Sequence, residues 1–242
     1  MATRRSNQAE TNWAAGIEGC LLVGIGTMLL RKGWDGQLPL YIHPRYVPLI
    51  WATALLVLLI GASRLWYVTG ATQALRGRMG MYALLLAPVA FGVLIPARPA
   101  GSALVDLRQM NTFGRGYRTA SVLAAGDSTT WTLLDWMFAR YTLTPEEARG
   151  KPVDLVGFVY RAPDQPASEF YVARYVLSCC VADRSGVSLL VRWAGAAALH
   201  DDQWVRVTGS IELRPGADQP EFVIANAQVA QVEPPKEPYL YP

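Results

Sequence analysis

The sequence predicts a membrane protein with about three N-terminal transmembrane helices, two short helices, and a small, mainly β C-terminal barrel. Charged residues make up only 17% of the 242 residues, against about a quarter in an ordinary soluble domain. The apolar excess falls in the first hundred residues, and period-two alternation begins after Gly150. We therefore expect a transmembrane region (1–97), a linker (98–129) and a β domain (130–242).

Three apolar stretches, residues 13–30, 46–68 and 79–96, are the candidate membrane spans. A helix needs roughly 20 largely apolar residues to cross about 30 Å of hydrocarbon. The second stretch meets this length, and the other two are slightly short. Two arrangements fit residues 79–96: the segment crosses the bilayer, or it lies as a re-entrant or interfacial segment. The composition therefore predicts a multi-pass protein of the cell membrane in contact with lipid.

The orientation follows from the basic residues of the short loops. The N-terminus and the loop after the second stretch carry Arg4, Arg5, Arg76 and Arg78, against Arg31, Lys32 and Arg45 in the first loop. This modest bias favours a cytoplasmic N-terminus. Three crossings then place the β domain outside the cytoplasm.

Two short helices are expected before the barrel. Trp131, Leu134 and Phe138 recur at helical spacing in "TWTLLDWMFARYT". In "TPEEARG", Thr144 is a natural N-cap, Glu147 completes a capping box, and Gly150 ends the helix. We expect both helices to be structural; the alternative for the first is that it lies on the membrane surface.

Five stretches rich in Val, Ile and aromatic residues read as strands: 153–161, 170–180, 186–193, 203–213 and 221–232. A short helix or turn, "AGAAALHDD", separates the third from the fourth. This order, with Gly157 and Gly209 at bends, is typical of a small Greek-key barrel of the oligonucleotide/oligosaccharide-binding (OB) type. In "WVRVTGSIEL", alternation places Val205, Val207 and Ile211 on the core side and Trp204 on the other.

Several function classes are disfavoured by the composition. The net charge of +3 is mild and the basic residues are scattered, whereas nucleic-acid binding needs clustered Lys and Arg. An extracytoplasmic domain would not meet nucleic acid either. No phosphate-binding loop, nucleophile elbow or H-E-x-x-H motif occurs, so we expect no enzymatic activity.

Four segments carry a family resemblance: "LYIHPRYVPLIWA", "LLAPVAFGVLIPARPAGS", "GKPVDLVGFVYR" and "YVLSCCVADRSGVSLLVRW" continued by "DDQWVRVTGSI". They resemble the bacterial YcgQ-type membrane proteins, the companions of a separate YcgR/YraQ-type permease. The resemblance covers nearly the whole chain and implies a membrane-anchored accessory subunit of a permease. The positions that match its motifs are His43, Pro44, Arg45, Gly157, Cys179, Cys180, Asp183, Asp202, Trp204 and Gly209.

The adjacent cysteines Cys179 and Cys180 allow three interpretations. In the first, one packs inward and the other lies at the barrel rim. In the second, one or both thiolates bind a soft or borderline metal with Asp183, joined by His200 or Asp201; thiolate, carboxylate and imidazole together suit zinc or copper. In the third, the pair exchanges with a partner's thiols. His43 and Arg45 lie in the predicted outer loop, where a loop-shaping role for His43 is the simpler interpretation.

The sequence thus leads to an accessory subunit of a two-component permease complex, whose outer domain binds or hands over a metal ion or another small ligand. The alternatives are a ligand-free assembly module and a thiol redox partner protein.

Overall fold

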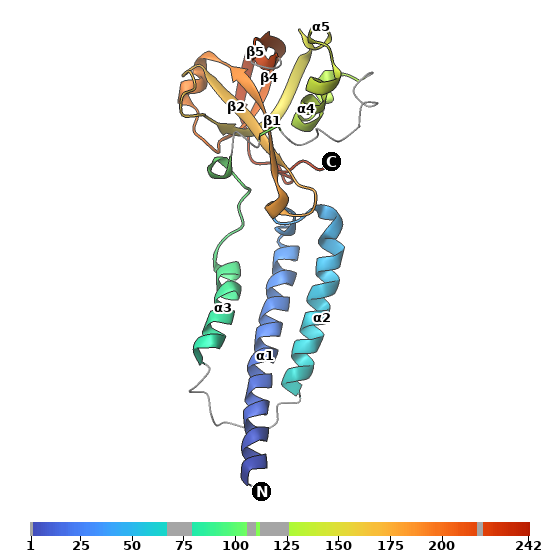
Figure 1. The fold of residues 1–242 in the computed structure, drawn as a ribbon, viewed down its shortest axis with the longest axis vertical. Helices are drawn as coiled ribbons and strands as arrows, with labels where there is room; N and C mark the ends of the chain where they lie inside the picture. The colour runs from blue at the N-terminus through green and yellow to red at the C-terminus, as the bar shows by residue number, and fades with distance from the viewer. Residues whose placement is uncertain (1, 67–78, 106–109, 112–125, 217–219) are drawn as a thin grey trace. The chain divides into compact units, whose positions relative to one another are not determined.

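The computed structural model describes residues 2–66, 79–105, 110–111, 126–216 and 220–242. Contacts divide the chain into two compact units, Met1–Arg98 and Pro99–Pro242, and each is described here by itself (Figure 1). Residues 106–109 and 112–125 of the expected linker, and positions 76 and 78 of the orientation argument, lie outside the described residues.

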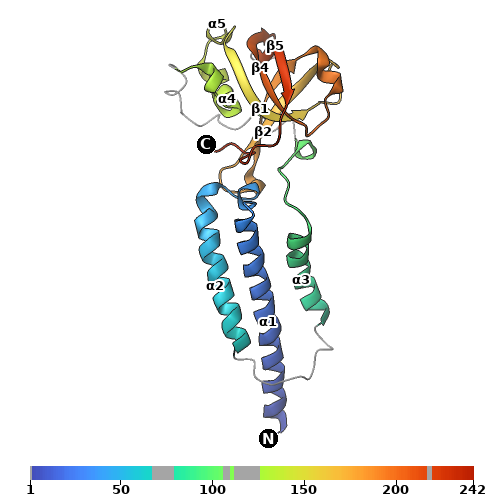
Figure 2. The ribbon, with the colours of Figure 1, turned by 180° about the vertical axis from the view of Figure 1, so that it is seen from behind.

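The first unit consists of α1 (Ala2–Trp34), α2 (Val47–Trp66) and α3 (Met79–Leu94), with 3-10 turns at Leu38–Leu40 and Pro44–Tyr46. Opposite views show α1 between α2 and α3 (Figures 1 and 2). Among the described residues, one helix is long and apolar enough to cross a membrane: Pro44–Trp66, with a mean hydropathy of 2.0. Helix α3 has only 16 residues, about 24 Å at 1.5 Å per residue. The structure therefore supports one of the three expected spans.

A stripe of small residues brings α1 and α2 into close contact. On α1, Gly19, Gly26 and Gly33 recur every seven residues. A Cβ added at Gly26 would lie 2.6 Å from Leu58 Cγ and 3.1 Å from the Ala54 carbonyl oxygen. The backbones can approach this closely only because these positions lack a side chain, as in many membrane helix pairs.

Close to this stripe, Glu18 on α1 forms an ion pair with Arg64 on α2. The Glu18 Oε2 and Arg64 Nη1 atoms are 3.7 Å apart, and about half of each side chain is exposed. Glu18 therefore faces a neighbouring helix, as expected for a carboxylate in an apolar segment.

The second unit is built around a closed barrel of five strands (Figure 1). They are β1 (Pro152–Tyr160), β2 (Glu169–Val176), β3 (Ser185–Arg192), β4 (Trp204–Arg214) and β5 (Glu221–Gln231). Their spatial order is β1-β2-β3-β5-β4, and β4 pairs with β1 to close the barrel. Strand β5 lies parallel to β3, so the chain crosses over as a Greek-key barrel requires and a simple meander would not.

Alternation along the strands fills the barrel interior, as the sequence predicts. Val205, Val207 and Ile211 on β4 are completely buried. They belong to the larger of the two clusters of buried apolar side chains in this unit, here called the main core. Gly209, between them, admits no side chain, because a Cβ there would lie 2.6 Å from the Ala225 carbonyl oxygen of β5. The register between β4 and β5 shifts at this point, which places the glycine at an irregularity of the closing sheet.

The two predicted helices pack against this barrel. Helix α4 (Leu133–Thr142) begins with a capping box between Thr132 and Asp135. Helix α5 (Pro145–Ala148) begins with the predicted capping box of Thr144 and Glu147. The α4 side chains in the main core are Leu133, Leu134, Trp136, Met137 and Ala139. This burial confirms a structural role for α4.

A second apolar cluster, here called the outer cluster, comprises Met110, Phe158, Ala173, Tyr175, Leu177, Trp204 and Tyr239. Tyr239 belongs to the C-terminal segment, which lies along β2. Leu240 accepts a hydrogen bond from Leu177 N at 2.9 Å and donates one to Tyr175 O at 2.8 Å. The Leu240 side chain reaches the main core. The C-terminal segment therefore completes the packing of the barrel.

One expected strand boundary differs from the structure. Strand β2 ends at Val176, whereas we expected residues 170–180 to be extended. Cys179 and Cys180 consequently lie in a turn followed by a 3-10 helix at Val181–Asp183. The described parts of the expected linker pack on the barrel: Met110 joins the outer cluster, and the Asn111 side chain accepts from Ser188 N at 2.9 Å.

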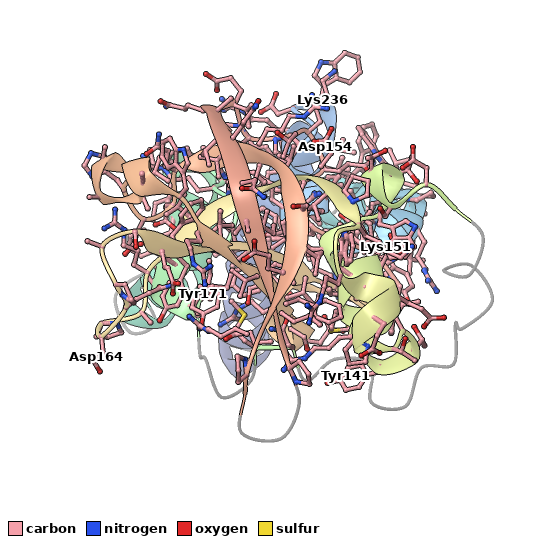
Figure 3. The ribbon with its side chains drawn as sticks, turned by 90° about the horizontal axis from the view of Figure 1, so that it is seen from above. Tyr141, Lys151, Asp154, Asp164, Tyr171 and Lys236 are labelled. Carbon is pink, nitrogen blue, oxygen red and sulfur yellow. The ribbon has the colours of Figure 1, made fainter. Side chains whose placement is uncertain are left out.

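Figure 3 shows the whole chain from above, with its side chains as sticks. Lys151, just before β1, and Asp154, on β1, lie on one side of the β4 and β5 ribbons, and Tyr171 of β2 lies on the other. Asp164, in the loop after β1, is exposed at the periphery. These labelled positions mark opposite flanks of the barrel.

Candidate functional site

The turn after β2 brings the two cysteines and Asp183 together. The Asp183 carboxylate accepts hydrogen bonds from Cys179 N at 2.8 Å and Cys180 N at 3.1 Å. The two Sγ atoms are 3.6 Å apart, and both cysteines are reduced. One ligand atom from each of the three residues lies within 4.8 Å of the other two. Cys179 and Asp183 are exposed and Cys180 is half-buried, so solvent reaches the cluster.

The carboxylate and the thiol influence each other's protonation. The pKa of Cys179 is raised to about 11. The largest cause is hydrogen bonding to Asp183, and the second is hydrogen bonding to Cys180. For Asp183, desolvation acts to raise the pKa, but hydrogen bonds from the Cys179 thiol and from neighbouring backbone N–H groups outweigh it and lower the pKa. At neutral pH the turn thus holds a carboxylate beside a protonated Cys179 thiol.

His200 does not join this cluster. Among the described residues, the group of side chains able to share one ion comprises Cys179, Cys180 and Asp183, without His200. His200 is exposed in the turn before β4, and its backbone N–H donates to Gln203 Oε1 at 3.1 Å. The expected four-residue ligand set is therefore reduced to three in this arrangement.

Asp202 and Trp204 make contacts that stabilise the β domain. Asp202 has a positive φ of 67°, and its carboxylate accepts from Ser102 N, which holds residues 101–102 against the barrel. Trp204 lies in the outer cluster, 6.1 Å from the Phe158 ring centroid, with the Arg174 guanidinium 5.9 Å from the Trp204 ring centroid. Both residues organise the outer face of the barrel.

His43 and Arg45 shape the turn before α2. His43 is the N-cap of the 3-10 turn, and its Nδ1 accepts a hydrogen bond from Arg45 N at 3.1 Å. The Arg45 guanidinium lies 5.8 Å from the Tyr46 ring centroid. These contacts are those of a loop-shaping pair.

The contribution of Arg174 and the C-terminal segment to the barrel was not among the features expected from the sequence. Arg174 donates to the carbonyl oxygens of Glu237, Pro238 and Tyr239. The signal available in the sequence was the apolar triplet "YLY" after the proline-rich "EPPKEP". An apolar triplet after a polar, proline-rich stretch indicates a segment that docks.

Comparison with known proteins yields two similarities. A Streptococcus mutans protein, whose provisional name describes it as a subunit of a two-component membrane permease complex, is 34% identical over 101 residues. The match covers 41% of this chain and 36% of that protein, so the chain matches about a third of the relative's length. Residues 127–242, which include the whole barrel, match the family described as DUF1980 C-terminal domain.

Proposed function

We propose that this chain is a membrane-anchored, non-enzymatic accessory subunit of a two-component permease complex, as expected for a YcgQ-type protein. The observation that carries the proposal is the similarity to the Streptococcus mutans permease-complex subunit, together with the match of the β domain to the DUF1980 C-terminal domain. The separate partner would be the permease itself. Nucleic acid has no part in this role.

The first unit supports anchoring in lipid. Along α2, large apolar side chains face outward: Leu49, Leu55, Leu56, Leu59 and Ile60 are each at least 43% exposed. An extended apolar surface of this kind would be unfavourable in water and marks a membrane or protein contact. We propose that α1 and α3 cross the bilayer with α2, which would put the β domain outside the cytoplasm.

The turn at Cys179, Cys180 and Asp183 is the element by which the domain would bind or hand over a small ligand. The rival thiol-redox role is less well supported by the chemistry. With its pKa of about 11, only about one Cys179 thiol in ten thousand is ionised at pH 7, and the thiolate is the nucleophile. A ligand-free assembly module is the remaining alternative, and metal titration distinguishes it from a metal-binding domain.

Association is tested by co-expressing the tagged full chain with the permease encoded beside it and purifying both in mild detergent. We expect the permease to co-purify at a fixed ratio and the chain to resist extraction from membranes with alkaline carbonate. A chain that carbonate extracts, or that never retains the permease, contradicts the proposal.

Topology is tested separately with a cysteine at the exposed loop position Asp164 (Figure 3). In a background with Cys20, Cys179 and Cys180 replaced by serine, Asp164→Cys should react with a membrane-impermeant maleimide in intact cells. Labelling that requires cell lysis would place the β domain in the cytoplasm and refute its outer location. An unlabelled serine-only parent is the control.

A further inference from the structure

The spacing of the two sulfurs in the turn after β2 limits which ion they can share. Zinc–sulfur bonds are about 2.3 Å long, so two sulfurs 3.6 Å apart would subtend about 103° at a shared ion. This angle is close to the tetrahedral value of about 109°. A linear two-sulfur site with bonds of that length would need the sulfurs about 4.6 Å apart. The observed pair therefore fits a tetrahedral ion better than a linear one.

The third donor has the matching charge and is held in place. The Asp183 carboxylate is oriented by the backbone N–H groups of Cys179 and Cys180, and these two bonds leave acceptor capacity on the carboxylate for an ion. One ligand atom of Asp183 and the two Sγ atoms lie within 4.8 Å of one another, which brings all three donors to one place. Two sulfurs and one oxygen suit zinc-like ions and exclude the oxygen-loving Mg²⁺ and Ca²⁺.

We propose that Cys179, Cys180 and Asp183 form an open, three-ligand site for a tetrahedral, borderline-soft divalent cation of the Zn²⁺ class. On binding, each thiol gives its proton to the buffer and the two thiolates and the carboxylate bind the ion. The fourth position is left to water or to a donor from another protein, which is the arrangement of an exchanging site rather than a closed structural one. The metal site itself is argued from the geometry of the turn, and only the hand-over of the ion rests on the proposed function.

The site is tested with the full chain purified in detergent, stripped of metal and reduced, then titrated with Co²⁺. We expect one equivalent to produce sulfur-to-cobalt charge-transfer absorption and the intense visible bands of tetrahedral cobalt, both abolished by one equivalent of Zn²⁺. Cys179→Ser and Cys180→Ser should each weaken binding at least tenfold. Asp183→Asn should weaken it several-fold.

Cys20→Ser, in the helical unit, and His200→Ala are the matched controls and should bind Co²⁺ as tightly as the parent chain. The proposal is overturned if the parent chain shows no charge-transfer band, if the band survives in the double cysteine variant, or if His200→Ala abolishes it. Because the parent spectrum alone is decisive, misfolding of a variant leaves the test intact. If the chain binds no metal but the permease still co-purifies, only this metal site is refuted. If the chain binds the metal but the permease does not co-purify, only the subunit role is refuted.

Discussion

The guanidinium of Arg174, on β2, donates a hydrogen bond from Nε to the backbone carbonyl oxygen of Pro238 at 3.0 Å. Its Nη2 also donates to Glu237 O and to Tyr239 O. A single half-buried cation thus binds three successive carbonyl oxygens of the C-terminal segment. Together with the backbone bonds of Leu240, this arrangement fixes the segment to the barrel.

Replacing Arg174 should therefore release the segment. We expect Arg174→Met to lower the free energy of unfolding by about 2 kcal/mol, because a charged donor is lost and the part-buried carbonyls of Pro238 and Tyr239 are left without it. The measurement is thermal unfolding of the full chain followed by tryptophan fluorescence. Arg149→Met, at an exposed arginine after α5, is the control and should change little. Equal effects of the two substitutions would show that the Arg174 contacts contribute nothing specific.

The contact between α1 and α2 predicts a sharp contrast between two neighbouring glycines. Gly26→Ala places a Cβ 2.6 Å from Leu58 Cγ, so we expect about 1–3 kcal/mol of destabilisation from overpacking. Gly24→Ala meets only Val89 Cγ1 at an ordinary 3.6 Å and should be neutral. Thermal stability in detergent, read as the temperature of aggregation, distinguishes them. A neutral Gly26→Ala would contradict the close approach of the two helices.

The ion pair between Asp154 and Arg206 predicts a defined pH dependence. The hydrogen bond from Arg206 lowers the pKa of Asp154, so the carboxylate stabilises the fold above its unfolded pKa of about 3.9. This contribution is lost as the pH falls through the lowered folded pKa. Because the pair is partly exposed, we expect Asp154→Asn to cost at most about 1 kcal/mol at pH 7 and low salt.

This stability difference between parent and Asp154→Asn should shrink below about pH 4 and at high salt. Denaturant titrations at several pH values measure it, and Asp164→Asn at the exposed loop position should give no such trend. A difference that is constant down to pH 2 would rule out a role for the ionised Asp154.

The high pKa of Cys179 predicts slow alkylation in chelator-treated, metal-free protein. With its pKa at about 11, the rate with iodoacetamide should keep rising through pH 10. Asp183→Asn removes the largest cause of the shift, so the pKa should fall toward about 8.5 and the rate at pH 8 should rise about tenfold or more. Peptide mass spectrometry follows Cys179 separately from the other cysteines. A rate that levels off near pH 9 in the parent would contradict the influence of Asp183.

Much of the β domain is encoded by local patterns that a reader of the sequence can use. The alternation at Val205, Val207 and Ile211 correctly assigns the buried face of β4. Thr144 and Glu147 mark the start of α5 because a capping box needs only residues three apart. Such features depend on neighbours in the sequence, so they can be predicted without knowledge of the tertiary fold.

Other features depend on contacts between distant residues or on competing hydrogen bonds. The apolar run through Leu177 suggested a longer β2, but Asp183 accepts the backbone N–H groups of Cys179 and Cys180 and withdraws them from the strand ladder. The triplet containing Leu240 indicates a docking segment, but the residues of β2 and of the main core that it packs against are far away in the sequence and are known only from the structure. The separation of His200 from the cysteines is likewise a property of the barrel.

The pairing of β1 with β4 has a consequence for how the domain folds during synthesis. Residues 152–158 find their partners at residues 204–210, about fifty positions later in the chain. Because the polypeptide is made from its N-terminus, β1 keeps an unpaired edge until β4 has been synthesised. Pairings between such distant residues also form slowly. We expect this interval to be the stage at which newly made chains aggregate or engage a chaperone.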